Sequence, residues 1–206
     1  MAGAHEHIER AEHAQHTAHA SDAEGSRFSN RTIALMIAVL ALFLAIAETM
    51  GKSAQTNALS FNVEASNLWA FFQAKTIRQT AVRTAGEMVE LTRPQVTDPA
   101  VSDVIAKRLD AWTKTAARWE SEPETQEGRR ELAARAKKAE EKRDLALARY
   151  HHYEVSSAAF QIAIVLASAT VITGAMALAW LAIAVGGIGL VFSGIGLFAP
   201  HAVHLF

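Results

Sequence analysis

Residues 32–47 read TIALMIAVLALFLAIA, and this stretch decides the fold class because it contains no charged side chain. With residues 48–50 it forms an apolar segment of about 19 residues, close to the ~20 that an α-helix needs to cross ~30 Å of hydrocarbon. About 30 polar residues come first, whereas the apolar core of a signal peptide lies near the N-terminus. The sequence therefore predicts a retained membrane span at residues 31–51.

A second uncharged stretch, residues 156–200, contains no Asp, Glu, Lys or Arg. It is about twice the length of one span, so two helices joined by a tight turn fit it better than one helix. We expect spans at residues 156–179 and 181–200, followed by a short tail at residues 201–206.

The middle of the chain carries most of the charge: of 20 Lys and Arg residues, 17 lie between Lys52 and Arg149. Acidic residues alternate with these basic ones, which indicates a solvated helix surface and not a nucleic-acid-binding face. The chain has no cysteine, which excludes disulfides and cysteine-based metal or redox chemistry.

The sequence of residues 52–155 predicts a helical stalk with helices at about 58–92, 98–120 and 125–155. A weak break is expected after the first span, at Gly51, Ser53, Thr56 and Asn57. Pro94 ends the first helix because the residue before a proline is biased out of the helical region.

Thr97 and Asp98 can cap the second helix, with Pro99 at its first position. Pro123 interrupts that helix. The last helix continues without Pro or Gly into the membrane, and would be roughly 80 Å long if it ran from Thr125 to Ala179. The predicted fold is an all-α integral membrane protein: three transmembrane helices with a long antiparallel, coiled-coil-like stalk between the first and second.

The first stalk helix carries a seam of residues at alternating steps of four and three, which is the spacing of a coiled coil. These residues are Val63, Asn67, Ala70, Ala74, Ile77, Ala81, Thr84, Met88 and Leu91. The spacing predicts that this face packs against another helix at coiled-coil geometry.

Each span carries a row of small residues, which allow membrane helices to approach closely. The rows are Ala34, Ala38, Ala41 and Ala45; Ala159, Ala163, Ala167, Thr170, Gly174 and Ala177; and Ala182, Gly186, Gly189, Ser193 and Gly196. One interpretation is packing of the three spans within one subunit, and the other is a homo-oligomer that meets along a row. The two are compatible.

Glu48 continues the first row, and an acidic residue within a span is a functional candidate. Lys52 lies four residues on, in the favourable orientation for an ion pair that fixes the depth of the helix at the interface. Proton or cation handling is the alternative role for Glu48.

The first 30 residues form a His- and Glu-rich tail that we expect to be mobile or marginally helical. Its histidines His5, His7, His13, His16 and His19 are weak candidates for Zn, Cu or Ni ligands, and their protonation near pH 6 would change the charge of the tail. The alternative is a solvated tail without a metal site.

The aromatic and imidazole side chains of Tyr150, His151, His152 and Tyr153 occur just before the second membrane entry, where aromatic belts lie, and are interpreted as interface anchors. No phosphate-binding loop, H-E-x-x-H or G-x-S-x-G motif is present, so the sequence predicts neither catalysis nor a cofactor.

The stretches NRTIALMIAVLALFLAIAETMGKSAQT (residues 30–56) and EASNLWAFFQAKTIRQT (Glu64–Thr80), with the final pair of spans, resemble a bacterial membrane family catalogued as domain of unknown function 4337. The resemblance covers nearly the whole chain and is most specific at residues 67–75. It implies a three-span bacterial protein with no assigned activity. In that segment, Trp69, Phe71 and Phe72 spread around the helix. They predict a packing surface against the helix of Trp112 and Trp119, with a partner-binding patch or a contact with the membrane surface as the alternatives.

These observations favour a non-catalytic, oligomeric membrane scaffold or accessory protein whose stalk binds itself or a membrane protein partner. A channel that uses Glu48 and the small-residue rows is one alternative, and a pH or metal sensor acting through the tail is another. We expect the bacterial inner membrane, with the stalk and the C-terminus on the cytoplasmic side, because the short tail and the neutral hairpin tip are easier to translocate.

Overall fold

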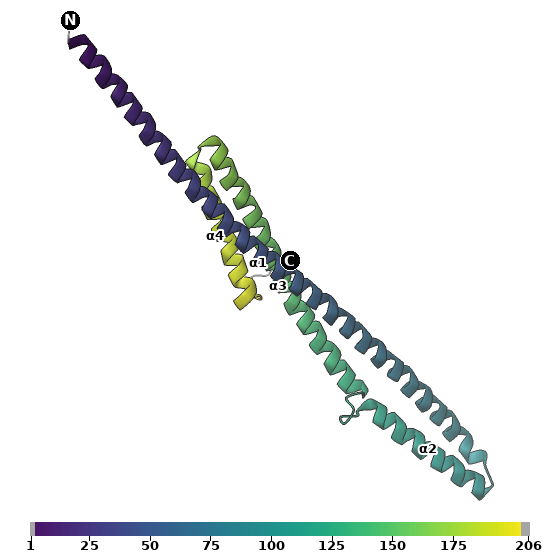
Figure 1. The fold of residues 1–206 in the computed structure, drawn as a ribbon. Helices are drawn as coiled ribbons and strands as arrows, with labels where there is room; N and C mark the ends of the chain where they lie inside the picture. The colour runs from purple at the N-terminus through teal and green to yellow at the C-terminus, as the bar shows by residue number, and fades with distance from the viewer. Residues whose placement is uncertain (1–2, 203–206) are drawn as a thin grey trace. The chain divides into compact units, whose positions relative to one another are not determined.

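The computed structural model describes the backbone of residues 3–202 and the side chains of residues 31–202. All regular elements in this part of the chain are helices (Figure 1). In chain order they are α1 (Gly3–Thr92), the short 3₁₀ helix η1 (Arg93–Gln95), α2 (Pro99–Glu120), α3 (Arg129–Thr173) and α4 (Met176–Phe198). The all-α fold class predicted from the sequence is confirmed.

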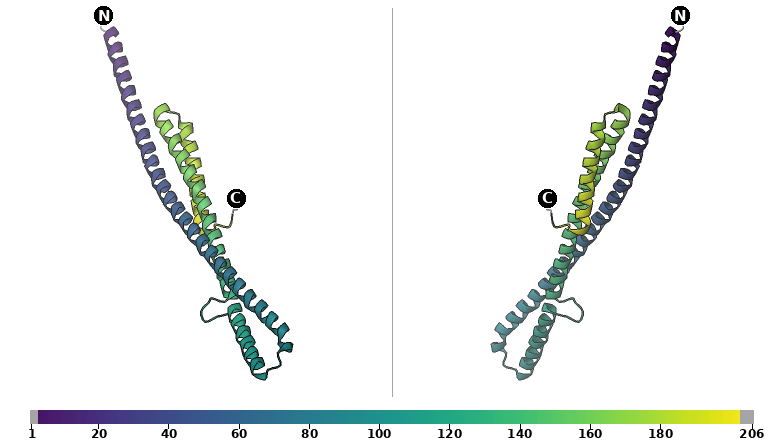
Figure 2. Two further views of the ribbon diagram at one scale, coloured as in Figure 1. Left: turned by 90° about the vertical axis from the view of Figure 1, so that its right-hand side faces the viewer. Right: turned by 90° about the vertical axis from the view of Figure 1, so that its left-hand side faces the viewer.

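Three helices in the described residues are long and apolar enough to cross a membrane: α1 from Arg31 onward, α3 and α4. The chain divides into two compact units, of which unit 1 comprises residues 1–53 and 148–206 and unit 2 comprises residues 54–147. Within unit 1, the end of α3 and the whole of α4 form an antiparallel helical hairpin (Figure 2). Unit 1 holds the apolar segments of all three helices, and unit 2 holds the charged helical segment between the first and second spans, as the sequence predicts.

Unit 1 has a small apolar core built from all three helices. Its buried residues are Ile33, Leu40 and Ala47 on α1, Phe160, Ala163 and Ala167 on α3, and Ala182 on α4. The aromatic rings of Phe43 and Phe160 stack at a centroid distance of 6.0 Å. Large side chains from α1 and α3 therefore pack against small residues on α4.

The small-residue row of α4 and the first four members of the second row, Ala159 to Thr170 on α3, lie inside unit 1, which supports the interpretation of packing within one subunit; Gly174 and Ala177 are exposed. Ala182, Gly186, Gly189 and Gly196 are buried on α4, and Ser193 shares a hydrogen bond of 2.6 Å with Ser156 of α3. A Cβ atom on Gly189 would lie 2.9 Å from the ring of Phe160, and one on Gly186 would lie 2.8 Å from Leu40. Close approach of these helices thus depends on the absence of side chains at the two glycines.

The turn between α3 and α4 comes earlier than the sequence predicts. The prediction places the end of the second span at residue 179 and Gly174 within its packing row, but α3 ends at Thr173 and α4 begins at Met176. Gly174 has a φ of +70°, a left-handed conformation that suits glycine, and its N–H donates to Thr170 O at 2.9 Å. Hydropathy alone does not reveal this end because apolar residues continue on both sides.

The predicted break after the first span is wrong, because α1 continues without interruption through Gly51 and Asn57. Gly51 is buried, and a Cβ atom there would lie 3.4 Å from Tyr153 Cβ. A single glycine costs a helix only about 1 kcal/mol relative to alanine, so the contact of α1 with α3 explains its place better than a turn does.

In unit 2, α1 packs through a different face from the heptad seam that runs from Val63 to Leu91, which we call the outer seam. The residues of the packing face, which we call the inner seam, either contact α2, α3 or the loop between them (Ala65, Leu68, Phe72, Lys75 and Gln79) or line the hollows beside α2 (Val82, Gly86 and Val89). Eight of the nine outer-seam residues are exposed and Ala74 is half-buried, so the seam selected from the sequence does not pack inside unit 2. The inner seam has the same alternating spacing, but it includes the polar residues Lys75 and Gln79. A search for apolar residues at this spacing therefore does not select it.

The ends of the unit 2 helices follow local chemistry. Asp98 caps α2 by accepting a hydrogen bond of 2.8 Å from the N–H of Ala100, with Pro99 at the first position, as predicted. Helix α3 begins at Arg129 and not near Thr125, because residues 121–128 form a loop in which Gln126 has a φ of 60°.

We predict that Gly189→Ala destabilises the protein by about 1–3 kcal/mol, because the new methyl group would overpack against Phe160. Gly187→Ala is the matched control, since a Cβ atom there meets nothing within 4 Å. Thermal unfolding of the detergent-solubilised protein measures both variants. Equal melting temperatures for the two would contradict the packing of α4 on α3.

Candidate functional site

The most highly connected polar cluster in the described residues lies in unit 2, around Gln79 of α1. Gln79 is only 2% exposed. Its Nε2 donates to Ala116 O of α2 at 2.9 Å and to a Glu120 carboxylate oxygen at 3.1 Å, and its Oε1 accepts a hydrogen bond of 2.5 Å from Arg129 Nη1. A buried amide needs such partners because an unsatisfied polar group is costly. We call this cluster the polar junction.

Arg129, the first residue of α3, joins the three helices of the polar junction. Its Nη1 also donates to Glu120 Oε2 at 2.9 Å, and its Nε donates to Thr76 Oγ1 at 2.9 Å. The guanidinium lies 5.0 Å from the centroid of the Phe72 ring. The start of α3 is thereby fixed against α1 and against the end of α2.

The loop between α2 and α3 is held by Glu131. Its carboxylate accepts hydrogen bonds from Ser121 Oγ at 2.7 Å and from the N–H of Glu122 at 3.1 Å. A Cβ atom at Gly128 would collide with Glu131 Oε2 and Glu122 N, so only glycine fits there. The loop is thus closed onto the first turn of α3.

The aromatic side chains in the segment 67–75 lie beside the polar junction. Trp69 and Phe72 pack on the unit 2 core of Ala65, Leu68, Leu132, Ala136 and Ala139, with Trp69 Nε1 donating to Glu140 at 2.9 Å. The prediction that they pack against the helix of Trp112 and Trp119 is wrong, because α2 ends beside Gln79 and α3 occupies this part of α1. Phe71 is exposed, and Lys75 Nζ lies 5.2 Å from the centroid of its ring.

Lys75 is buried and is balanced by two carboxylates of the loop region, Glu122 at 3.6 Å and Glu127 at 3.9 Å. Hydrogen bonding from Gln79 is the main cause that lowers the pKa of Glu120 below its ordinary value of 4.5, with Arg129 and Arg130 adding to it. The hydrogen bond from Ser121, and then that from the Glu122 backbone, lowers the pKa of Glu131. Both carboxylates are therefore held in the charged form.

In unit 1, the row Ala34, Ala38, Ala41 and Ala45 is exposed, so it does not take part in packing within unit 1 as the rows of α3 and α4 do. Glu48 is exposed as well and accepts a hydrogen bond of 3.3 Å from Gln161 Nε2 of α3. Gln161 was not predicted. The ion pair of Glu48 with Lys52 stays a prediction.

A second polar group in unit 1 joins α3 to α4. Ser156 Oγ donates to Gly189 O at 2.7 Å, and His152 Nε2 donates to Pro200 O at 3.0 Å. His152 and Tyr153 are buried against Gly196. The prediction that they are interface anchors is wrong for these two residues, because the end of α4 covers them.

The candidate metal ligands His5, His7, His13, His16 and His19 lie outside the residues whose side chains are described. Within residues 31–202, no group of three or more His, Asp or Glu side chains is arranged to hold a metal ion. Sequence analysis did not identify the residues of the polar junction, nor Gln161 and Ser156, because single polar residues in helices form no recognisable motif. The one usable signal was the tryptophan- and lysine-containing segment at residues 67–75.

The fold defines a class of all-helical proteins with three candidate spans and a charged helical unit between the first and second. The family model described as "Domain of unknown function (DUF4337)" matches residues 29–199. The chain belongs to this family, as its sequence suggested. No curated protein and no solved structure matches the chain.

We predict that Glu120 and Glu131 contribute acid-sensitive stability to the protein. Because their pKa values are lowered in the folded state, this contribution is present above the ordinary value of 4.5 and is lost as the pH falls through the lower folded values. The Glu120→Gln, Glu131→Gln double variant should therefore lose less stability than wild type when the pH falls below about 5.

Thermal unfolding followed by circular dichroism across this pH range measures the effect. Glu64→Gln, which alters an exposed carboxylate without a hydrogen bond among the described residues, is the control and should keep the wild-type pH dependence. Parallel curves for the double variant and wild type would rule out this role for the two carboxylates.

Proposed function

We propose that this protein is a non-catalytic membrane scaffold or accessory protein that works as an oligomer, with unit 2 as the stalk that engages another chain. The supporting observation is apolar surface on unit 2 that its own helices leave uncovered. No residue between positions 80 and 115 is buried, although Met88, Leu91, Val101 and Val104 are large and apolar. Exposed apolar surface of this extent in water is typical of an interaction site.

The polar groups of unit 2 support a structural role over catalysis. In the polar junction, Gln79, Arg129 and Glu120 are bonded to one another, and the buried Lys75 lies beside two carboxylates. A general acid or base needs access to a substrate proton, and a nucleophile needs an adjacent base. These side chains instead hold three helices together.

A hollow of about 450 Å³ on one side of the α1–α2 hairpin is lined by Gly86, Leu109 and Trp112, together with charged residues such as Glu87 and Asp110. A second of about 540 Å³ is lined by Val89, Val104 and Trp112. Both are open to solvent, because two helices alone cannot enclose a core. Additional helices from another chain would supply the missing layer.

We propose a location in the bacterial inner membrane with the stalk on the cytoplasmic side. Family membership and three apolar helices support a membrane location. The short, weakly charged N-terminal tail and the uncharged turn between α3 and α4 are the easier segments to translocate, which favours retention of the stalk in the cytoplasm. The heptad spacing of α1 supports a coiled-coil contact between stalks.

We predict that the detergent-solubilised protein has the mass of more than one chain, or co-purifies with a membrane protein at a fixed ratio. Light scattering corrected for bound detergent measures this mass. The contrary result is a single-chain particle that conducts protons or cations in liposomes and loses this flux in the Glu48→Gln variant. This result would favour the channel alternative, in which the exposed Glu48 and its hydrogen-bond partner Gln161 line the path.

We predict that a cysteine at Thr125, in the exposed loop of unit 2, is protected from an impermeant thiol reagent in intact cells. A cysteine at Ala175, in the turn between α3 and α4, should react. Both positions are exposed and the chain has no other cysteine. Labelling of Thr125→Cys with protection of Ala175→Cys would reverse the proposed orientation.

A further inference from the structure

We propose that the outer seam of α1 is a parallel coiled-coil interface with the outer seam of a second copy of this chain. The inference rests on the proposed oligomeric function and adds the partner, the face and the direction of the contact. Its starting point is that α1 carries two coiled-coil seams in unit 2 and that α2 and α3 use only the inner one.

The two seams lie on opposite sides of α1. Successive residues of a helix are 100° apart, so residues two positions apart point about 200° away from each other. Outer-seam residue Ala70 lies two positions from both Leu68 and Phe72 of the inner seam, and Leu68 and Phe72 pack on the core formed with α3. The outer seam therefore faces away from the rest of unit 2.

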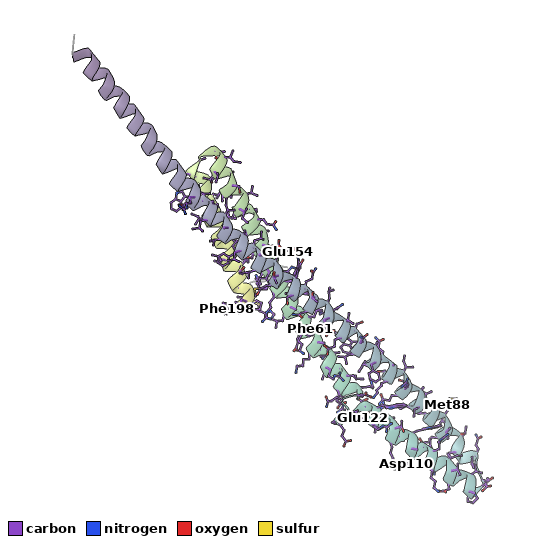
Figure 3. All side chains as sticks on the ribbon, in the orientation of Figure 1. Phe61, Met88, Asp110, Glu122, Glu154 and Phe198 are labelled. Carbon is purple, nitrogen blue, oxygen red and sulfur yellow. The ribbon has the colours of Figure 1, made fainter. Side chains whose placement is uncertain are left out.

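The outer seam is uncharged and, apart from Asn67 and Thr84, apolar, which is unusual for an exposed face of a charged helical segment. Val63, Ile77, Met88 and Leu91 are 58%, 69%, 65% and 78% exposed, respectively, and Met88 is labelled in Figure 3. Alanines fill most of the positions between them, and no Asp, Glu, Lys or Arg belongs to the seam. The inner seam, by contrast, includes Lys75, so the more apolar of the two seams is the one left in water.

The spacing of the outer seam identifies its partner as another helix with the same repeat. Residues 63–91 alternate in steps of four and three over four heptads, and a repeat of 3.5 residues stays in contact only with a helix that supercoils in the same way. Asn67 falls at an a position when Ala70 and Ile77 are placed at d. A single buried Asn at a favours an in-register parallel pair, in which the two amides bond to each other.

A second copy satisfies these conditions because each copy carries an identical seam. Helix α1 runs from its candidate span into unit 2 without interruption, so copies with one orientation in a membrane present this helix in the same direction and at the same distance from the membrane. The same residue number then meets itself across the interface. Lipid cannot cover the seam where α1 continues in water, and the absence of charge offers nothing to an acidic or basic partner.

Disulfide cross-linking in native membranes tests this pairing. Ala70→Cys, at a d position, and Ala81→Cys, at an a position, should each oxidise to a product with the mass of two chains, since equivalent residues at a and d lie within disulfide range in a parallel pair. Ala134→Cys is the matched control: it is an exposed alanine on α3, away from the seam. The Ala134→Cys variant should keep the mass of one chain after oxidation.

A charged side chain in the seam supplies the second test. Ile77→Lys should lower the particle mass of the full-length protein in detergent, because two like charges would meet at one layer, whereas Ala134→Lys should leave the mass unchanged. Retained helix content by circular dichroism establishes that the variants are folded.

The outcomes separate this inference from the proposed function. An oligomeric wild type in which neither Ala70→Cys nor Ala81→Cys cross-links, or in which all three cysteines cross-link equally, overturns the seam pairing and leaves the oligomeric scaffold standing. A cross-linked product whose second component is another protein overturns the second copy as partner. A wild type that is single in membranes and in detergent overturns both proposals.

Discussion

The bonding of Gln79 to Arg129 and Glu120 is the interaction on which the arrangement of unit 2 depends. A buried amide and a partly buried guanidinium are stable only when their hydrogen bonds are satisfied, and this requirement admits one register of α1 against the end of α2 and the start of α3. Apolar contacts tolerate sliding far better, because alanine-rich helices offer similar surfaces at each turn. The polar junction therefore accounts for why the less apolar face of α1 is the one that packs inside the chain.

This choice of face also explains which parts of the structure the sequence predicts. The three spans, the end of the first stalk helix before Pro94 and the cap at Asp98 depend on neighbouring residues, and each was predicted from local chemistry. The packing face of α1 depends on residues far apart in the chain, such as Gln79 and Arg129, and apolar periodicity selected the opposite face. The position of the α3–α4 turn at Gly174 was also not predicted. The sequence is equally apolar on both sides of this turn, so hydropathy does not reveal a helix end that depends on the backbone conformation of one residue.

Unit 1 is stabilised by a different physical principle. Where lipid is as apolar as the side chains, helices associate through close approach and hydrogen bonding, and α4 provides both through Gly186, Gly189 and Ser193. The small-residue row that the sequence marks on α4 faces the other two helices, and the closeness of Leu40 to Gly186 and of Phe160 to Gly189 explains why glycine is needed there. The row of alanines on α1 is exposed and has no such contact within unit 1. Two rows of small residues with the same spacing in the sequence therefore lie in different environments, one buried between helices and the other on the surface of unit 1.

Helix α1 thus has one face committed to its own chain in unit 2 and a second, more apolar face in water. Leaving large apolar side chains exposed costs free energy roughly in proportion to their area, and replacing Ile77, Met88 or Leu91 by a polar residue would cost the isolated chain little. An uncharged heptad repeat over this length is therefore better explained by a contact outside the chain than by the stability of unit 2 itself. Under the proposed scaffold function, recognition depends on which surfaces of two chains meet, and the buried polar side chains of unit 2 serve to hold the more apolar face of α1 outward.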